Sequence, residues 1–161
     1  RLLALLLLVA AFKKSDARQR ARIYRVYRQN TRHINSWDLV DASAHHIMGD
    51  YLFRRCREPL YRLAASPVMW ERRIAVIATW HFIGQGDYAD TLRIADMLLA
   101  DREDLIHKAV GWMLREIGKR DEETAHAYLK AHCCDMPRTM LRYAIERFPE
   151  HLRRKYLRGA I

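Results

Sequence analysis

Trp37 and Asp41 are the first residues whose types and spacing could support chemistry. They lie four positions apart in the segment INSWDLVDASA, so on a helix they share one face. A carboxylate beside an aromatic wall suits a site where positive charge develops on a sugar, because the anion stabilises the cation and the ring excludes water. The same spacing also allows a structural Asp41 that caps a helix or forms a salt bridge.

A second candidate element is the segment LIHKAVGWMLREIGKRD, which carries two stripes at helical spacing. One stripe is apolar, and the other is basic with a Trp in its middle. The basic stripe consists of Lys108, Trp112, Arg115 and Lys119. A planar ring among cations suits a sugar or a base held between phosphate contacts. The alternative is a Trp112 that covers the hydrophobic core.

Two further segments supply arginines. In WERRIAVIATW, Arg72 and Arg73 begin an apolar helical run, so one of them must face away from the core. The simple interpretation is a surface ion pair with Glu71 or a neighbour, whereas an inward guanidinium could clamp a phosphate or orient Asp41. In MPRTMLRYAIERF, Arg138 and Arg142 share one helix face.

Motifs for other chemistries are missing or poorly spaced. His132, Cys133 and Cys134 are consecutive, whereas the ligands of tetrahedral zinc sites are usually separated along the chain. The sequence has no glycine-rich phosphate loop, no Gly-x-Ser-x-Gly turn and no His-Glu-x-x-His helix. We therefore expect neither a metal nor an organic cofactor.

The net positive charge of the chain favours a polyanionic partner, and nucleic acid is the leading candidate. The formal net charge is +10, and the segment from Lys13 to Arg32 contains eight basic residues and one acidic residue. The segment 87–104 is acidic, and we expect its carboxylates on an outer, solvent-facing side.

The chain has three cysteines, and this odd number argues against a disulfide framework and favours a reducing cytoplasm.

The elements that must position these residues are all predicted to be helices, separated by short polar breaks. A basic residue that begins an apolar run recurs at Arg73, Lys108 and Arg142, separated by 35 and 34 positions. This period predicts stacked helix pairs that form a curved α-solenoid, an all-α superhelix of HEAT/ARM-like repeats, as a single domain over residues 1–161. The expected helices are 2–12, 16–31, 36–54, 57–65, 69–83, 87–99, 104–118, 121–133 and 137–147, with Asn35 or Ser36 as the N-cap of the third.

The apolar run from Leu2 to Phe12 has the length of a signal-peptide core, but a basic stretch continues directly from Lys13 and no cleavage motif follows. We interpret the run as a buried helix and expect further helices to precede Arg1. A run this short does not predict a membrane span.

In order and spacing, INSWDLVD, WERRIAVIATW, LIHKAVGWMLREIGKRD and MPRTMLRYAIERFPE resemble the bacterial DNA alkylation repair glycosylases built from HEAT-like repeats, the AlkD-like alkylpurine DNA glycosylases. The resemblance covers nearly the whole chain. In that family a catalytic Asp, two Trp and an Arg meet at the lesion, and the motifs place them at Asp41, Trp37, Trp112 and Arg73. Relatives that bind DNA without glycosylase activity lack the Asp. The family also uses an aromatic residue from an N-terminal helix, which we expect upstream of Arg1.

The resemblance implies an enzyme that hydrolyses the N-glycosidic bond of cationic N3- or N7-alkylated purines in double-stranded DNA. Asp41 would be catalytic, and the remaining site residues would bind substrate and DNA, namely Trp37, Arg73, Trp112, Lys108, Arg115, Arg138 and Arg142. We expect a cytoplasmic monomer with no obligate protein partner and no membrane association. Two alternatives stay open: a non-catalytic helical module that binds damaged or branched DNA, and a scaffold for an acidic protein.

Overall fold

The computed structural model describes residues 1–161 and is entirely helical, with no β-strand. The helices in chain order are α1 (Leu2–Lys14), α2 (Ala17–Gln29), the 3-10 helix η1 (Thr31–His33), α3 (Trp37–Asp41), the π-helix η2 (His45–Gly49), α4 (Asp50–Phe53), α5 (Glu58–Ala64), α6 (Met69–Ala78), α7 (Trp80–Gly84), α8 (Ala89–Met97), α9 (Asp104–Gly118), α10 (Glu122–His132), α11 (Arg138–Ala144) and α12 (Glu150–Arg158).

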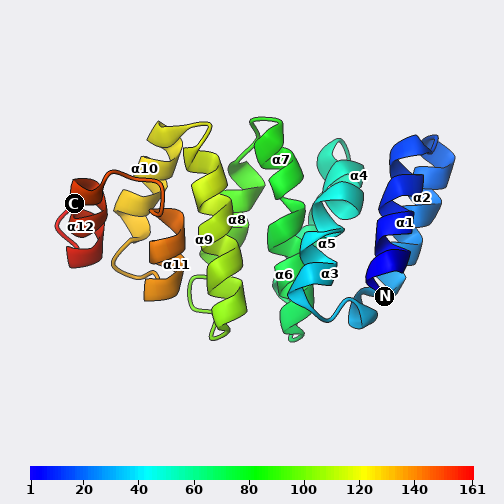
Figure 1. Cartoon of the computed structure of the whole chain (residues 1–161), viewed down its shortest axis with the longest axis horizontal. Coiled ribbons are helices and arrows are strands. Elements are labelled where there is room, and N and C mark those ends of the chain that lie inside the picture. The colour runs from blue at the N-terminus through cyan, green and yellow to red at the C-terminus, as the bar shows by residue number, and fades with distance from the viewer.

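The helices stand side by side along the long axis of the molecule and follow the order of the chain, from α1 and α2 at one end to α12 at the other (Figure 1). Within this row α6 packs against both α3 and α9, and α11 packs against α9. We call this set the α3–α6–α9–α11 layer. Every residue of the candidate site described below belongs to it.

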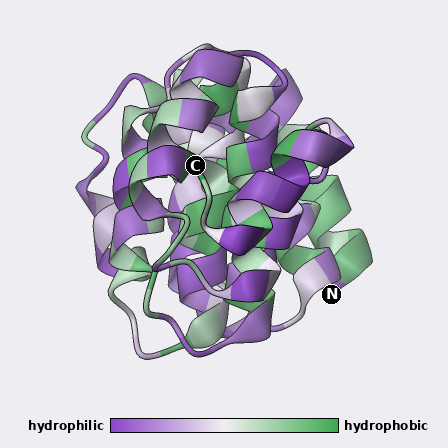
Figure 2. Cartoon of the chain, turned by 90° about the vertical axis from the view of Figure 1, so that its left-hand side faces the viewer, coloured by the Kyte–Doolittle hydropathy of each residue, from purple (hydrophilic) through white to green (hydrophobic).

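The buried apolar side chains of the helices form one hydrophobic core. Figure 2 colours the ribbon by hydropathy and shows hydrophobic and hydrophilic residues alternating along most of the helices. Helix α1 is the exception, because Leu3 and Leu7 are exposed although Val9 and Phe12 are buried. This helix confirms the predicted element 2–12, but most of its apolar surface has no partner within the chain. No helix has the length and the apolar character needed to cross a membrane.

Two predicted helices are interrupted. The expected helix 36–54 divides into α3, a turn, η2 and α4, and the expected helix 69–83 divides into α6 and α7. Each break falls at a buried hydroxyl that binds a carbonyl of the preceding turn: Ser43 Oγ donates to Leu39 O at 2.6 Å, and Thr79 Oγ1 donates to Val76 O at 2.7 Å. Such side-chain bonds compete with the helical ladder and bend helices.

Helix α12 was not predicted, although its boundaries carry ordinary signals. It begins after Pro149 with Glu150 in its first turn, and it ends at Gly159 in the left-handed conformation, with φ of 66°. Its anchor is Tyr156, which is buried against the core. Only one residue of the short segment is buried, so the apolar periodicity that indicates a helix is weak here.

The prediction that the carboxylates of the acidic segment 87–104 face solvent is confirmed for Asp96, Glu103 and Asp104 and is wrong for Asp90 and Asp101. Asp90 is buried and shares the guanidinium of Arg57 with Asp87. Asp101 is equally enclosed and pairs with Arg72. These carboxylates tie neighbouring helices together across 29 to 33 positions of sequence, so they are not a free acidic face.

Candidate active site

Helix α3 is short and sets the positions of Trp37 and Asp41. Ser36 precedes it with an extended backbone and stands at the N-cap, as predicted, but its hydroxyl binds the carboxylate of Asp38 and no backbone N–H. One helical turn then separates Trp37 from Asp41. The side chain of Trp37 is exposed, whereas that of Asp41 is only 18% exposed.

Arg73 of α6 binds both oxygens of the Asp41 carboxylate. Its Nε donates to Oδ1 at 3.0 Å and its Nη2 to Oδ2 at 2.8 Å, while Nη1 donates to the carbonyl of Leu105 at 2.5 Å. The Arg73 side chain is only 6% exposed. Each of its three guanidinium nitrogens donates a hydrogen bond to a group inside the protein. This geometry favours orientation of Asp41 over a phosphate clamp. Arg72 is the arginine that faces away, toward Asp101.

A cleft of about 360 Å³ opens at this ion pair. Its walls come from all four helices of the α3–α6–α9–α11 layer, and the lining residues are Trp37, Asp41, Arg73, Leu105, Lys108, Trp112, Arg115 and Tyr143. Six of the eight residues singled out in the sequence therefore meet in one place. Three cations line the cleft against one carboxylate, so its charge suits an anionic ligand.

Arg138 and Arg142 do not line this cleft. Both are exposed on α11, and Arg138 Nη1 donates to the carbonyl of Leu157 at 2.6 Å. Their predicted contact with DNA remains a proposal for the surface beside the cleft.

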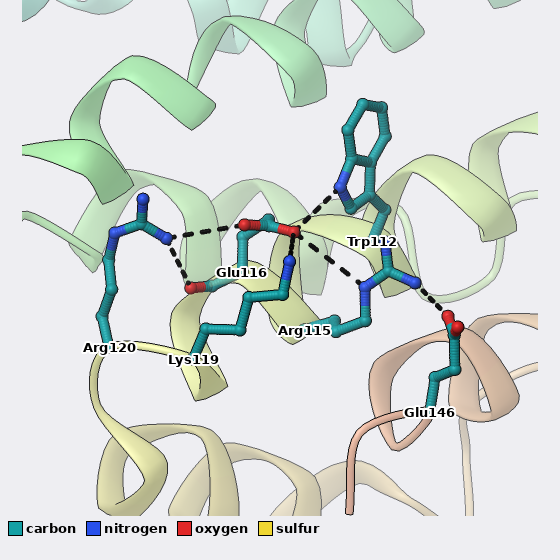
Figure 3. Close-up of polar contacts among 6 residues, drawn as sticks. All are labelled: Trp112, Arg115, Glu116, Lys119, Arg120 and Glu146. Carbon is teal, nitrogen blue, oxygen red and sulfur yellow. Dashed lines mark hydrogen bonds and ion pairs between the residues drawn. The ribbon is translucent and has the colours of Figure 1, made fainter.

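The ring of Trp112 packs against another aromatic ring, whereas the side chain of Trp37 is exposed. The Trp112 ring lies 5.0 Å from that of Trp80, which in turn lies 4.6 Å from the ring of His45. The indole N–H of Trp112 donates to Glu116 Oε1 at 3.1 Å (Figure 3). A fixed ring on one wall and an exposed ring on the rim could enclose a planar or sugar group between them.

The cations of α9 each have a carboxylate neighbour. Lys108 Nζ lies 2.7 Å from Asp104 Oδ2, and this hydrogen bond, together with the charge of Asp104, raises the pKa of Lys108. Arg115 contacts Glu146 of the C-terminal segment. Lys108 is still partly open to the cleft, so it can exchange its carboxylate for a phosphate at its surface.

Tyr143 and Leu105 are lining residues that the sequence reasoning missed. Tyr143 enters the cleft because α11 crosses α9 closely at Gly111, where an added Cβ would lie 2.4 Å from Met140 O and 2.6 Å from the Tyr143 Cβ. A glycine inside an amphipathic helix is a signal of close approach, but it does not say which residue approaches. No group of three or more His, Cys, Asp or Glu side chains is placed to hold a metal ion.

The fold and the cleft define an all-helical protein with a cationic site built around one carboxylate and two indole rings. The family described as DNA alkylation repair enzyme matches residues 1–148, a span that includes every residue of the cleft. The chain therefore belongs to the DNA alkylation repair enzyme family, and the resemblance seen in its motifs is confirmed. Searches of curated proteins and of solved structures gave no match.

Proposed function

We propose that the protein is a DNA glycosylase that hydrolyses the N-glycosidic bond of cationic N3- or N7-alkylated purines in double-stranded DNA. The single observation that carries the proposal is the placement of Asp41. Its carboxylate lines the cationic cleft, is held by Arg73 in one orientation, and lies in the same cleft as Trp37 and Trp112. This is the arrangement that a developing sugar cation requires.

The reaction needs few groups from the protein. The C1′–N9 bond breaks and its electron pair moves to the alkylated purine, which leaves as a neutral base because it already carried a positive charge. The Asp41 carboxylate stabilises the sugar cation, and a water oxygen then bonds to C1′ while its proton passes to Asp41 or to solvent. Trp37 and Trp112 would pack on the deoxyribose, and the cations of α9 would hold its phosphates.

We further propose that the helix row is a curved solenoid of HEAT/ARM-like repeats. Contacts that recur at similar sequence separations support it: Asp41 to Arg73 and Arg73 to Leu105 each span 32 positions. Close approaches of a glycine to a neighbouring helix occur at Gly49 and again at Gly111, each to a carbonyl 29 positions further on. Repeated contacts of this kind are expected where each helix pair stacks on the next.

Release of free base is the decisive measurement. The protein is incubated with duplex DNA that carries 7-methylguanine or 3-methyladenine, and the released purine is separated and quantified. We expect release above the spontaneous rate for the wild type and near the spontaneous rate for Asp41→Asn.

A non-catalytic module that binds damaged or branched DNA is the second candidate. The observation that favours it is that both oxygens of Asp41 are engaged by Arg73, as in a structural ion pair. Tight binding of alkylated or branched duplex without release of any base would establish this alternative in place of the enzyme.

A further inference from the structure

Glu116 of α9 is a buried carboxylate, 5% exposed, with three basic side chains near it. Figure 3 shows the side chains that surround it. Its Oε1 accepts from Trp112 Nε1 at 3.1 Å and from Lys119 Nζ at 2.5 Å and lies 4.0 Å from Arg115 Nε, while its Oε2 lies 3.5 Å from Arg120 Nη1. One carboxylate therefore gathers three cations and one indole N–H.

The charge on Glu116 is kept in spite of burial. Burial acts to raise the pKa of this carboxyl, but the hydrogen bond and the charge of Lys119 oppose it, followed by the Trp112 N–H and the charge of Arg115, and the pKa lies below its ordinary value. An ionised acceptor makes stronger hydrogen bonds than a neutral one. Glu116 is consequently a strong and permanent partner for the indole at neutral pH.

Trp112, which is hydrogen-bonded to Glu116, lines the cleft, although Glu116 itself does not; Arg115 also lines it, and its Nε lies 4.0 Å from Glu116 without a hydrogen bond. Trp112 and Arg115 belong to the cleft wall, and the carboxylate lies behind them. Arg115 is fixed from its other side by Glu146, which is about half exposed. Trp112 has one polar contact, the bond to Glu116, and its ring packs against Trp80.

We propose that Glu116 is a positioning residue for the candidate active site. It fixes the plane of the Trp112 indole through the N–H bond, so that the ring presents one face to the substrate sugar. A Trp side chain turns about two bonds, and loss of its only polar contact would let the ring leave this orientation. The proposal rests on the proposed glycosylase function for its effect on rate, but the contact can be tested without it.

The kinetic test compares Glu116→Gln with the wild type in single-turnover release of 7-methylguanine. The variant keeps the side chain's size but removes the charge. We expect the rate to fall about 10- to 100-fold, because small displacements of positioning groups cost rate on that scale. Affinity for duplex DNA should not fall, since Lys119 and Arg120 lose this counter-charge and remain cationic. A merely structural residue would lower rate and affinity together or only the stability.

Glu146→Gln is the matched control, because it removes the other carboxylate of Arg115 and makes no contact with Trp112. Its effect on rate should be less than about threefold. A double-mutant cycle completes the test: with Trp112→Phe, which keeps an aromatic ring but has no N–H, the added cost of Glu116→Gln should shrink to a few-fold. If Glu116→Gln lowers the rate as much in the Trp112→Phe background as in the wild type, the proposal is overturned.

A readout independent of activity is the indole N–H exchange of Trp112 in the NMR spectrum of ¹⁵N-labelled protein. The chain has four Trp, and Trp112→Phe identifies the signal by removing it. Exchange with solvent should be at least about tenfold faster in Glu116→Gln, since the proton loses a charged acceptor. Unchanged exchange, or an unchanged rate of release, would overturn the role of Glu116 even in an active enzyme.

Failure of the proposed glycosylase function can be distinguished from failure of the role of Glu116, because a wild type that releases no base still gives the N–H exchange result. If Glu116→Gln does not fold, which a thermal melt would reveal, Trp112→Phe alone tests the bond while leaving the three cations of Glu116 in place. Its release rate should then fall about tenfold or more. A rate equal to that of the wild type would show that the N–H bond positions nothing.

Discussion

Arg73 and Asp41 form a two-bond ion pair in which the guanidinium Nε and Nη2 each bind a different carboxylate oxygen, at 3.0 and 2.8 Å. The third nitrogen of Arg73 is bound to the Leu105 carbonyl, so the pair links α3, α6 and α9. A parallel, bidentate pair fixes the direction of the carboxylate as well as its charge. Asp41 is therefore oriented before any ligand arrives, and its remaining exposed surface faces the cleft.

Asp41→Asn tests whether this carboxylate acts by its charge. Asparagine keeps the size of the side chain but removes the anion that would face the sugar cation. Loss of one preorganised electrostatic group commonly costs about a hundred- to a thousandfold in rate, and we expect at least that loss in single-turnover release of 7-methylguanine. Binding of alkylated duplex should persist. The defect should be smaller on 3-methyladenine, because that adduct is the more labile of the two.

Asp38→Asn is the control for this prediction. Asp38 lies on the same short helix, three positions earlier, and contacts Ser36 outside the cleft. Its replacement should leave the release rate within about twofold of the wild type. Loss of activity in both variants would point to disruption of α3, and an active Asp41→Asn would make Asp41 a structural residue.

Arg73→Ala should destabilise the protein as well as slow it. The two side chains are 6% and 18% exposed, and removal of one partner of a buried pair commonly costs about 3 kcal/mol, because the other charge is left without compensation. The free energy of unfolding from urea titrations measures this cost. Arg154→Ala, which breaks the largely exposed pair with Glu150, should cost less than about 1 kcal/mol. Equal costs in the two variants would contradict a structural role for the Arg73 pair.

Much of the helical pattern could be predicted from sequence, because it follows from local periodicity, whereas the meeting of Trp37, Asp41, Arg73 and Trp112 in one site was predicted from the family resemblance. Trp37 and Asp41 share a face at four-residue spacing wherever a helix forms there, and Trp112 and Arg115 follow the same rule on α9. The short motifs also carried the family resemblance that the match over residues 1–148 confirms.

The parts that could not be predicted depend on contacts between helices distant in sequence. Tyr143 reaches the cleft only because α11 crosses α9 at Gly111, and Asp90 is buried only because Arg57 lies opposite it. A hydropathy pattern predicts that a carboxylate is exposed, and only the position of its ion-pair partner shows that it is buried. The breaks at Ser43 and Thr79 were missed because a hydroxyl inside an apolar helical run does not reveal whether it binds its own backbone.

Binding to undamaged duplex should weaken steeply as salt is added, because phosphate contacts release counterions. Lys108→Ala and Arg142→Ala should each reduce the slope of log K against log salt by about one. Lys108 lines the cleft and Arg142 is exposed on α11, next to Tyr143 of the cleft wall. Arg62→Ala on α5, outside the cleft, is the control and should leave the slope unchanged. Binding that is insensitive to salt would favour a protein partner.

His45 should make the fold sensitive to mild acid. Burial lowers its pKa to about 4, with smaller contributions from the charges of His46, Lys13 and His81. An unfolded chain would bind this proton near pH 6.5, so the unfolded state gains protons first as the pH falls. Stability should therefore decrease between about pH 6.5 and pH 4, by about 1 kcal/mol at pH 5 because the ring is partly exposed.

Urea titrations at pH 7.5 and pH 5 measure this difference. His45→Phe keeps an aromatic ring against Trp80 but cannot titrate, so the difference between the two pH values should shrink. Replacement of the exposed His151 by Gln should leave it as it is in the wild type. An undiminished difference in His45→Phe would assign the acid sensitivity to other groups.

Gly111→Ala tests whether the close crossing of α9 and α11 builds the cleft. An added Cβ would lie 2.4 Å from the Met140 carbonyl oxygen and 2.6 Å from the Tyr143 Cβ, and backbone atoms cannot yield as the end of a side chain can. The helices must separate, at a cost of about 1 to 3 kcal/mol, and Tyr143 should leave the cleft wall. Gly84→Ala meets no atom within 4 Å and should change the free energy of unfolding by less than about 1 kcal/mol in either direction. Base release by Gly111→Ala should also fall at temperatures well below its melting point, because Trp112 is the next residue of α9 and moves with it. A Gly111→Ala variant as stable and as active as Gly84→Ala would show that this crossing does not shape the cleft.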